Sequence, residues 1–227
     1  MEPNKVLYQF VLRLADHNMI MAQRMAEWCS RGPILEEDLA LTNISLDLLG
    51  QARTLYQYAA ELIGNNATED SLAYLRGERE YKNLLLVEQP RGDWALTVLR
   101  QYLFSQFQYL LFEQLQKSND AQLAAIAAKS IKETAYHVRW SKEWVIRLGD
   151  GTEESHRRMQ NAILELWNYT GEMFVPIDYE NEFVDLALIQ QQWNEYVKNV
   201  FEEATLSIPE NVFNQTGGKT GLHTEYL

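Results

Sequence analysis

The chain is poor in the residues that interrupt helices and in those that cross-link a fold. It has only 11 Gly and 5 Pro among 227 residues, which favours long helices over many short strands. A single cysteine, Cys29, excludes an internal disulfide and a metal site built from cysteines alone. One cysteine also fits the reducing conditions of the cytoplasm.

Basic residues are in the minority, and long apolar runs are missing. The chain carries 20 Lys and Arg against 32 Asp and Glu, for a net charge of −12. Without a basic run to offset repulsion from phosphate, we expect no binding to nucleic acid. No apolar stretch is long enough to span a membrane, and the first residues lack a signal peptide pattern. We therefore expect a cytoplasmic protein that is not inserted in a membrane.

What is present indicates a globular, all-α protein. Hydrophobic residues make up 46% of the chain and aromatic residues 11%, enough for a substantial core. Apolar side chains recur at helical spacing over most of the length. We expect one domain over residues 1–227 that forms a helical bundle, with an extended C-terminal tail from about residue 205. The expected helices are residues 4–30, 34–63, 94–117, 120–148, 153–174 and 184–204, with a shorter helical segment within 68–89.

Local signals mark several helix ends. Gly32 and Pro33 break the first helix, and Gly64 is a C-terminal cap for the second. Asp93 and Thr152 stand where N-caps of later helices are expected, because their side chains accept hydrogen bonds from the first free backbone amides.

Two helices carry polar positions that resemble a metal site without its ligands. Ferritin-like di-iron proteins present Glu-x-x-His, with both ligands on one helix face. Here the corresponding pairs are Leu48 with Gln51 and Thr134 with His137, so three of four positions lack a good iron ligand. The pattern predicts a ferritin-like bundle with a degenerate metal site that holds no metal. Such a fold would assist an oxygen-activating enzyme.

Polar side chains interrupt the apolar stripe near the middle of each long helix. If the helices are aligned, these groups meet in one polar layer, which we interpret as a hydrogen-bond network between neutral side chains. The positions are Asn18, Gln51, Gln106, Thr134 and His137.

Two other kinds of site stay open at this point. An enzyme could use Asp47, Glu133 and His137, although each acid is turned by about 100° from the ligand position. A ligand-binding module could use Arg76, Arg79 and Lys82 on the phosphates of coenzyme A. A solvated connector with mixed charges explains the latter segment somewhat better.

The remaining histidines indicate no catalytic site. We expect His17 at the surface or in an interface, beside Asp16, and His156 exposed in the first turn of a helix. His223 lies alone in the tail. The chain also lacks a Gly-x-Ser-x-Gly motif and a glycine-rich phosphate loop.

Six segments resemble the PaaC family, the non-catalytic ferritin-like subunits of bacterial phenylacetyl-CoA 1,2-epoxidases. They are residues 24–29, 44–53, 58–62, 83–90, 127–137 and 216–225. In the related catalytic protein, PaaA, the stretch matching Asp47–Gln51 reads Asp-Glu-Ala-Gly-His, and the stretch matching Lys132–His137 reads Lys-Glu-Glu-Ser-Phe-His. The resemblance therefore implies that Leu48, Gln51 and Thr134 stand where PaaA has ligands.

The resemblance also implies partners and a reaction. The chain would hold and orient PaaA, whose di-iron centre epoxidises the ring of phenylacetyl-CoA with oxygen and electrons from NADPH, in aerobic phenylacetate catabolism. PaaB and the flavin and iron–sulfur reductase PaaE would complete the complex. This chain would carry no cofactor and no catalytic residue. Residues near the CoA thioester would be Glu80, Tyr81, Lys82 and Asn83.

Helices one and two carry aromatic side chains beyond one bundle stripe, including Tyr8, Trp28 and Tyr56. Aromatic residues are enriched at protein interfaces, so we expect this side to contact PaaA.

Overall fold

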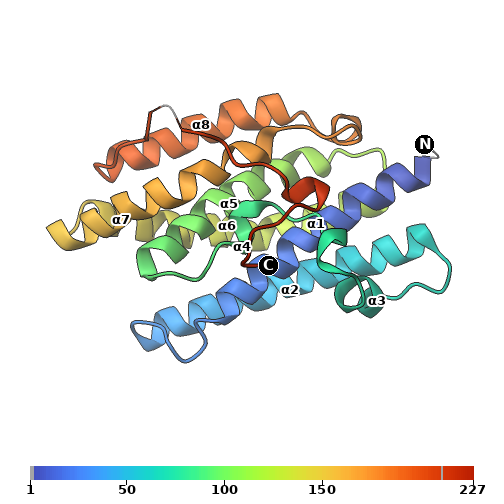
Figure 1. Cartoon of the computed structure of the whole chain (residues 1–227), viewed down its shortest axis with the longest axis horizontal. Coiled ribbons are helices and arrows are strands. Elements are labelled where there is room, and N and C mark those ends of the chain that lie inside the picture. The colour runs from blue at the N-terminus through green and yellow to red at the C-terminus, as the bar shows by residue number, and fades with distance from the viewer. Residues whose placement is uncertain (1–2, 211) are drawn as a thin grey trace. The chain divides into compact units, whose positions relative to one another are not determined.

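The computed structural model describes residues 3–210 and 212–227, and in these residues it contains helices and turns but no strand (Figure 1). The expected all-α class is confirmed. The chain divides into two compact units. Unit 1 comprises residues 1–90, 120–126 and 217–227, and unit 2 comprises residues 91–119 and 127–216. The prediction of a single domain stays a prediction, as does the ferritin-like arrangement.

Unit 1 is built on two long helices, α1 (Pro3–Ala26) and α2 (Leu35–Ile63), which pack side by side (Figure 1). Two short helices follow, α3 (Glu69–Tyr74) and α4 (Leu85–Glu88). The apolar faces of α1 and α2 pack against each other and form a core of fully buried side chains. An amphipathic helix removes its apolar face from water by packing it against another element. This core includes Phe10, Leu14, Met21, Met25, Leu41, Ile44, Leu48 and Leu55.

Unit 2 contains α5 (Trp94–Leu115), most of α6 (Ala121–Gly149), α7 (Glu153–Leu166) and α8 (Leu186–Glu203). Within this unit α5 packs against α7 and α8. Almost every residue of α5 is buried, as expected for a helix that is apolar on nearly all sides. The Trp193 indole of α8 is also buried and donates a hydrogen bond to the Leu103 carbonyl at 3.0 Å.

The caps expected from the sequence are confirmed. An Asp93 carboxylate oxygen accepts a hydrogen bond from the Leu96 amide at 3.0 Å, and the Thr152 hydroxyl accepts one from the Ser155 amide at 3.2 Å. Gly64 ends α2 with a φ of 66°, a conformation that favours glycine. These local contacts fix where α5, α7 and α2 begin or end.

Two helix ends differ from expectation. The first helix was expected to reach residue 30, but α1 ends at Ala26 and the chain turns before Gly32. The helix expected over 153–174 is α-helical only to Leu166 and continues as short 3-10 turns. A β-carbon on Gly171 would lie 2.4 Å from the Asn214 side chain, so the tail packs closely against this segment. Glycine also weakens a helix interior.

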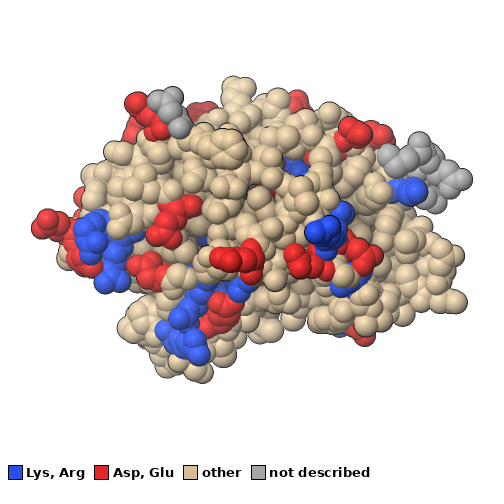
Figure 2. Space-filling view, in the orientation of Figure 1, with Lys and Arg blue, Asp and Glu red and all other residues tan. Residues whose placement is uncertain are grey.

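No helix in the described part of the chain has the length and apolar character needed to cross a membrane. On the face shown in Figure 2, acidic and basic side chains are interspersed rather than gathered by sign.

Candidate functional site

In unit 1, the degenerate ligand positions of α2 face the core. Leu48 is 0% exposed and Gln51 is 3% exposed. Asp47, the nearest acid, is only half-buried and lies one position off this face. A leucine offers no donor atom, so the α2 face presents one neutral amide where a di-iron helix would present a carboxylate and an imidazole.

In unit 2, Thr134 and His137 of α6 are both fully buried. The Thr134 hydroxyl donates a hydrogen bond to the Ser130 carbonyl at 3.0 Å, one turn earlier in the same helix. Glu133 is partly exposed. Within the described residues, no three His, Cys, Asp or Glu side chains gather as metal ligands would. The side chains of α2 and α6 therefore do not fit a di-iron centre, which needs four carboxylates and two histidines.

The five polar side chains expected to form one layer are all buried. Asn18 donates a hydrogen bond from its amide to the Leu14 carbonyl at 3.0 Å, within α1. Asn18 and Gln51 belong to unit 1, whereas Gln106, Thr134 and His137 belong to unit 2. A single network that joins all five stays a prediction.

A buried acid of α1 holds the segment between α3 and α4, residues 75–84, which we call the connector. Asp16 is fully buried and binds the Arg76 guanidinium through both carboxylate oxygens. Asp16 also accepts hydrogen bonds from the Tyr56 hydroxyl at 2.7 Å and the Lys82 amide at 2.9 Å. Burial lowers the pKa of Arg76, but hydrogen bonds and charge from Asp16 outweigh it and raise that pKa above its ordinary value. Burial raises the pKa of Asp16 above its ordinary value, although its hydrogen bonds and the charge of Arg76 act in the opposite direction. Each charge is therefore compensated by the other.

This arrangement changes what the three connector cations can do. Arg76 is committed to Asp16 and stacks on the Tyr81 ring, 4.2 Å from its centre. Lys82 donates from its ammonium to the Arg79 carbonyl at 3.1 Å, and Arg79 itself is exposed. Only Arg79 and Lys82 are placed to meet an external phosphate, so binding of coenzyme A by all three cations is disfavoured.

The four residues expected near a CoA thioester lie together on the connector but in different environments. Glu80 is exposed, and its carboxylate accepts a hydrogen bond from the Gly77 amide at 2.6 Å. Tyr81 and Lys82 are half-buried, whereas Asn83 is fully buried and donates to the Glu88 carboxylate at 2.9 Å. Asn83 therefore has a structural partner, and substrate contact by these residues stays a prediction.

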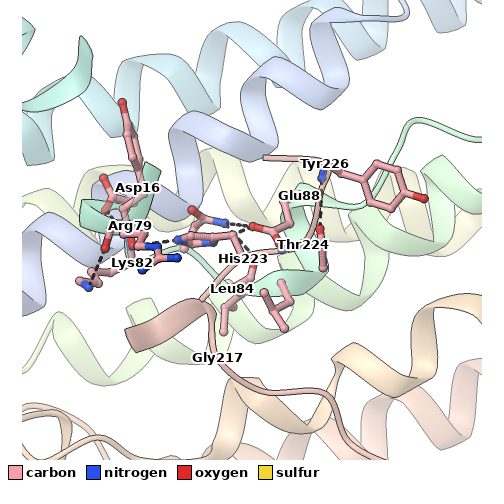
Figure 3. Close-up of polar contacts among 12 residues, drawn as sticks. Asp16, Arg79, Lys82, Leu84, Glu88, Gly217, His223, Thr224 and Tyr226 are labelled. Atoms are coloured by element: carbon pink, nitrogen blue, oxygen red, sulfur yellow. Dashed lines mark hydrogen bonds and ion pairs between the residues drawn. The ribbon is translucent and has the colours of Figure 1, made fainter. Parts of the chain in front are cut away.

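Residues 217–227, which we call the strap, contact the connector and α4 through Tyr81 and Glu88 (Figure 3). His223 places Nδ1 2.9 Å from a Glu88 carboxylate oxygen and Nε2 3.0 Å from the Tyr81 carbonyl. The other Glu88 oxygen accepts a hydrogen bond from the Thr224 amide at 2.6 Å. The sequence pattern of residues 216–225 indicated a family resemblance but no role for His223.

His17 was expected at the surface or in an interface, but it is buried inside unit 1, so the surface position was wrong. It is 2% exposed, and its Nδ1 accepts a hydrogen bond from the Leu84 amide at 3.2 Å. Burial, with smaller contributions from Arg13 and Lys219, lowers the pKa of His17 well below its ordinary value. His17 is thus a neutral ring that fixes the connector backbone against α1.

The surface of α2 also differs from expectation. Trp28 and Tyr56 are buried, so these two are not spare aromatic side chains of an interface, whereas Tyr8 is half-buried. Leucines at helical spacing are exposed instead, by 70%, 54%, 60% and 41% for Leu35, Leu39, Leu46 and Leu49. Leu49 also borders a pocket of about 380 Å³ whose wall includes Met19, Tyr56, Ala73 and Tyr74. We call these four leucines the α2 leucine stripe.

Comparison with known proteins identifies the family. The phenylacetic acid catabolic protein family, PaaA/PaaC, matches residues 1–227. The chain is 48% identical to the C component of the 1,2-phenylacetyl-CoA epoxidase of Escherichia coli (strain K12), over 97% of this chain and 91% of that protein. Because the match covers the whole chain, the chain belongs to the phenylacetic acid catabolic protein family.

Proposed function

We propose that this chain is the non-catalytic subunit of a cytoplasmic phenylacetyl-CoA epoxidase and that it holds and orients the catalytic di-iron protein PaaA. The observation that carries this proposal is the buried α2 face, where Leu48 and Gln51 stand in place of a carboxylate and a histidine. The similarity to the C component of an epoxidase supports the choice of complex.

The other polar clusters support a scaffold role, because their reactive groups are already engaged. A catalytic histidine needs one ring nitrogen free for a substrate proton. His223 uses both nitrogens within the chain. His17 is buried in the core, and its Nδ1 accepts a hydrogen bond from the Leu84 amide. Asp16 is likewise surrounded by Arg76, Tyr56 and Lys82. These groups fix the connector in place.

The α2 leucine stripe supplies the surface that a scaffold needs. Exposed apolar side chains in a row are a feature of protein interfaces, and the four leucines lie on one face of one long helix. We assign this face to PaaA. The contact is expected to bury more than ~1,000 Å², as specific interfaces do. PaaB and the reductase PaaE, which carries flavin and iron–sulfur groups, complete the proposed complex.

Reconstitution tests the proposal. Oxidation of phenylacetyl-CoA with oxygen and NADPH is measured for PaaA, PaaB and PaaE, with and without this chain. The proposal predicts activity only when the chain is present. Full activity without it would contradict a scaffold that the reaction needs. Turnover by this chain with PaaE but without PaaA would establish it as an enzyme in its own right.

A further inference from the structure

The strap is fitted closely to the connector. A β-carbon on Gly218 would lie 2.2 Å from the Asn83 carbonyl oxygen, and one on Gly221 would lie 2.2 Å from the Arg79 carbonyl oxygen. Gly221 also has a φ of 86°, which L side chains rarely adopt. The two backbones therefore approach to a distance that only glycine permits.

His223 is the polar contact at the centre of this fit, and its side chain and that of Glu88 are both 0% exposed. Its two ring nitrogens face the Glu88 carboxylate and the Tyr81 carbonyl, and both of these groups accept hydrogen bonds. A neutral imidazole has only one N–H, so it would leave a lone pair facing an oxygen. The imidazolium satisfies both contacts at once.

We propose that His223 is a proton-dependent clasp that seats the strap on the connector when the ring is charged and releases it when the ring loses its proton. The Glu88 carboxylate is the counter-charge. It also accepts hydrogen bonds from Asn83 and from the Thr224 amide, so it joins the strap, the connector and α4. Loss of the ring proton removes one of the two His223 contacts and the charge that balances Glu88.

Several other charged or titratable groups surround the clasp on each element packed against it. Arg24 of α1 donates to the Glu88 carbonyl and to the Tyr226 carbonyl, and it pairs with Glu27. Glu78 lies near enough to His223 to influence its charge. The remaining groups are His17 of α1, Arg79 and Lys82 of the connector, and Lys219 of the strap. His17 is held neutral by burial, so of these groups His223 is the one that changes charge near neutral pH.

The direction of the pH dependence follows from the ring's surroundings. Burial lowers the pKa of His223, but its hydrogen bonds to Glu88 and Tyr81 and the charge of Glu88 outweigh it and raise that pKa above the ordinary 6.5. A raised folded pKa means that the clasp is at full strength below the ordinary value. It weakens as pH rises through the higher folded value. The strap is therefore closed in mild acid and released in mild base.

Hydrogen exchange of the intact chain tests the clasp. Protection factors, corrected for intrinsic exchange rates, are measured for residues 217–227 at pH 6 and pH 9. The expected result is a fall of about tenfold, or about 1.4 kcal/mol, which is within what a hydrogen bond to a charged group contributes. His223→Gln should give low protection at both pH values, and His156→Gln, the matched control, should behave as wild type. Constant wild-type protection would overturn the proposal, as would pH dependence that persists in His223→Gln.

Titration of the wild-type ring provides a readout that needs no variant to fold. Nitrogen NMR of the chain's 4 histidines follows the protonation of each ring nitrogen. The clasp predicts that His223 carries a proton on both nitrogens at pH 6 and titrates above the ordinary value of about 6.5. A midpoint at or below that value, or one unprotonated nitrogen at pH 6, would overturn it.

Discussion

Arg76 binds both carboxylate oxygens of Asp16, which stands 60 positions earlier in the chain, with Nη1 3.0 Å from Oδ2. The side chains are 9% and 0% exposed. Because neither charge can be solvated in place, each depends on the other. The pair fixes the start of the connector to α1, and the same carboxylate holds the Lys82 amide. The connector is therefore anchored to the unit 1 core at Arg76 and at the Lys82 amide.

Removing Arg76 should be far more costly than removing a surface cation. Arg76→Ala leaves the Asp16 carboxyl buried without its counter-charge, and loss of one partner of such a pair costs about 3–5 kcal/mol. The matched control is Arg53→Ala, which breaks a pair with Glu69 whose arginine is 68% exposed. Exposed pairs contribute under ~1 kcal/mol. Urea unfolding followed by circular dichroism measures both, and equal losses would contradict a buried clamp.

Restoring an acid at the degenerate site should destabilise the chain in a pH-dependent way. Leu48→Glu places a carboxyl where the side chain is 0% exposed. Burial would raise its pKa above the unfolded value of about 4.3, so the destabilisation should be larger at pH 7.5 than at pH 4.5. Leu46→Glu is the control, because Leu46 is 60% exposed and its change should stay within about 0.5 kcal/mol. Unfolding free energies at both pH values decide this, and a pH-independent loss for Leu48→Glu would count against the prediction.

A charge on the α2 leucine stripe should weaken binding to PaaA. Leu46→Lys or Leu39→Lys is expected to reduce affinity about tenfold or more, since an interface leucine that contributes 1–2 kcal/mol corresponds to that factor. Leu164→Lys on α7 is the matched control, because Leu164 is 55% exposed and lies outside the stripe. Native mass spectrometry or a titration of PaaA measures the difference. Equal affinities for all three variants would place the interface elsewhere.

The sequence predicted the helices well where their ends depend on local chemistry. Asp93 and Thr152 cap helices through amides three residues away, so the signal lies within one turn. The sequence did not predict contacts between residues that are far apart in the chain. His223 meets Glu88 over a separation of 135 positions, which no helical period reveals.

The sequence also did not show whether an aromatic residue of α2 faces the core or the surface. Tyr56 follows Leu55 of the apolar stripe and was expected to face a partner. It is buried because its hydroxyl reaches Asp16 of α1, 40 positions earlier. The leucine stripe was missed for the complementary reason. Its residues are apolar, and hydrophobicity alone does not distinguish a core position from an uncovered one.

The degenerate ligand positions were found from spacing because the two residues of each pair lie on one turn of one helix. Leu48 and Gln51 are both buried on α2, and Thr134 and His137 are both buried on α6. The spacing does not show whether the two helices bring their pairs together, because that depends on packing between distant parts of the chain.

Iron analysis tests the central claim most directly. The chain is purified alone under anaerobic conditions with ferrous iron, and the metal is counted per chain beside PaaA treated in the same way. The account predicts no bound iron on this chain and a di-iron centre on PaaA, because Leu48, Gln51 and Thr134 leave too few anionic ligands. Stoichiometric iron on this chain, lost on His137→Ala, would contradict it.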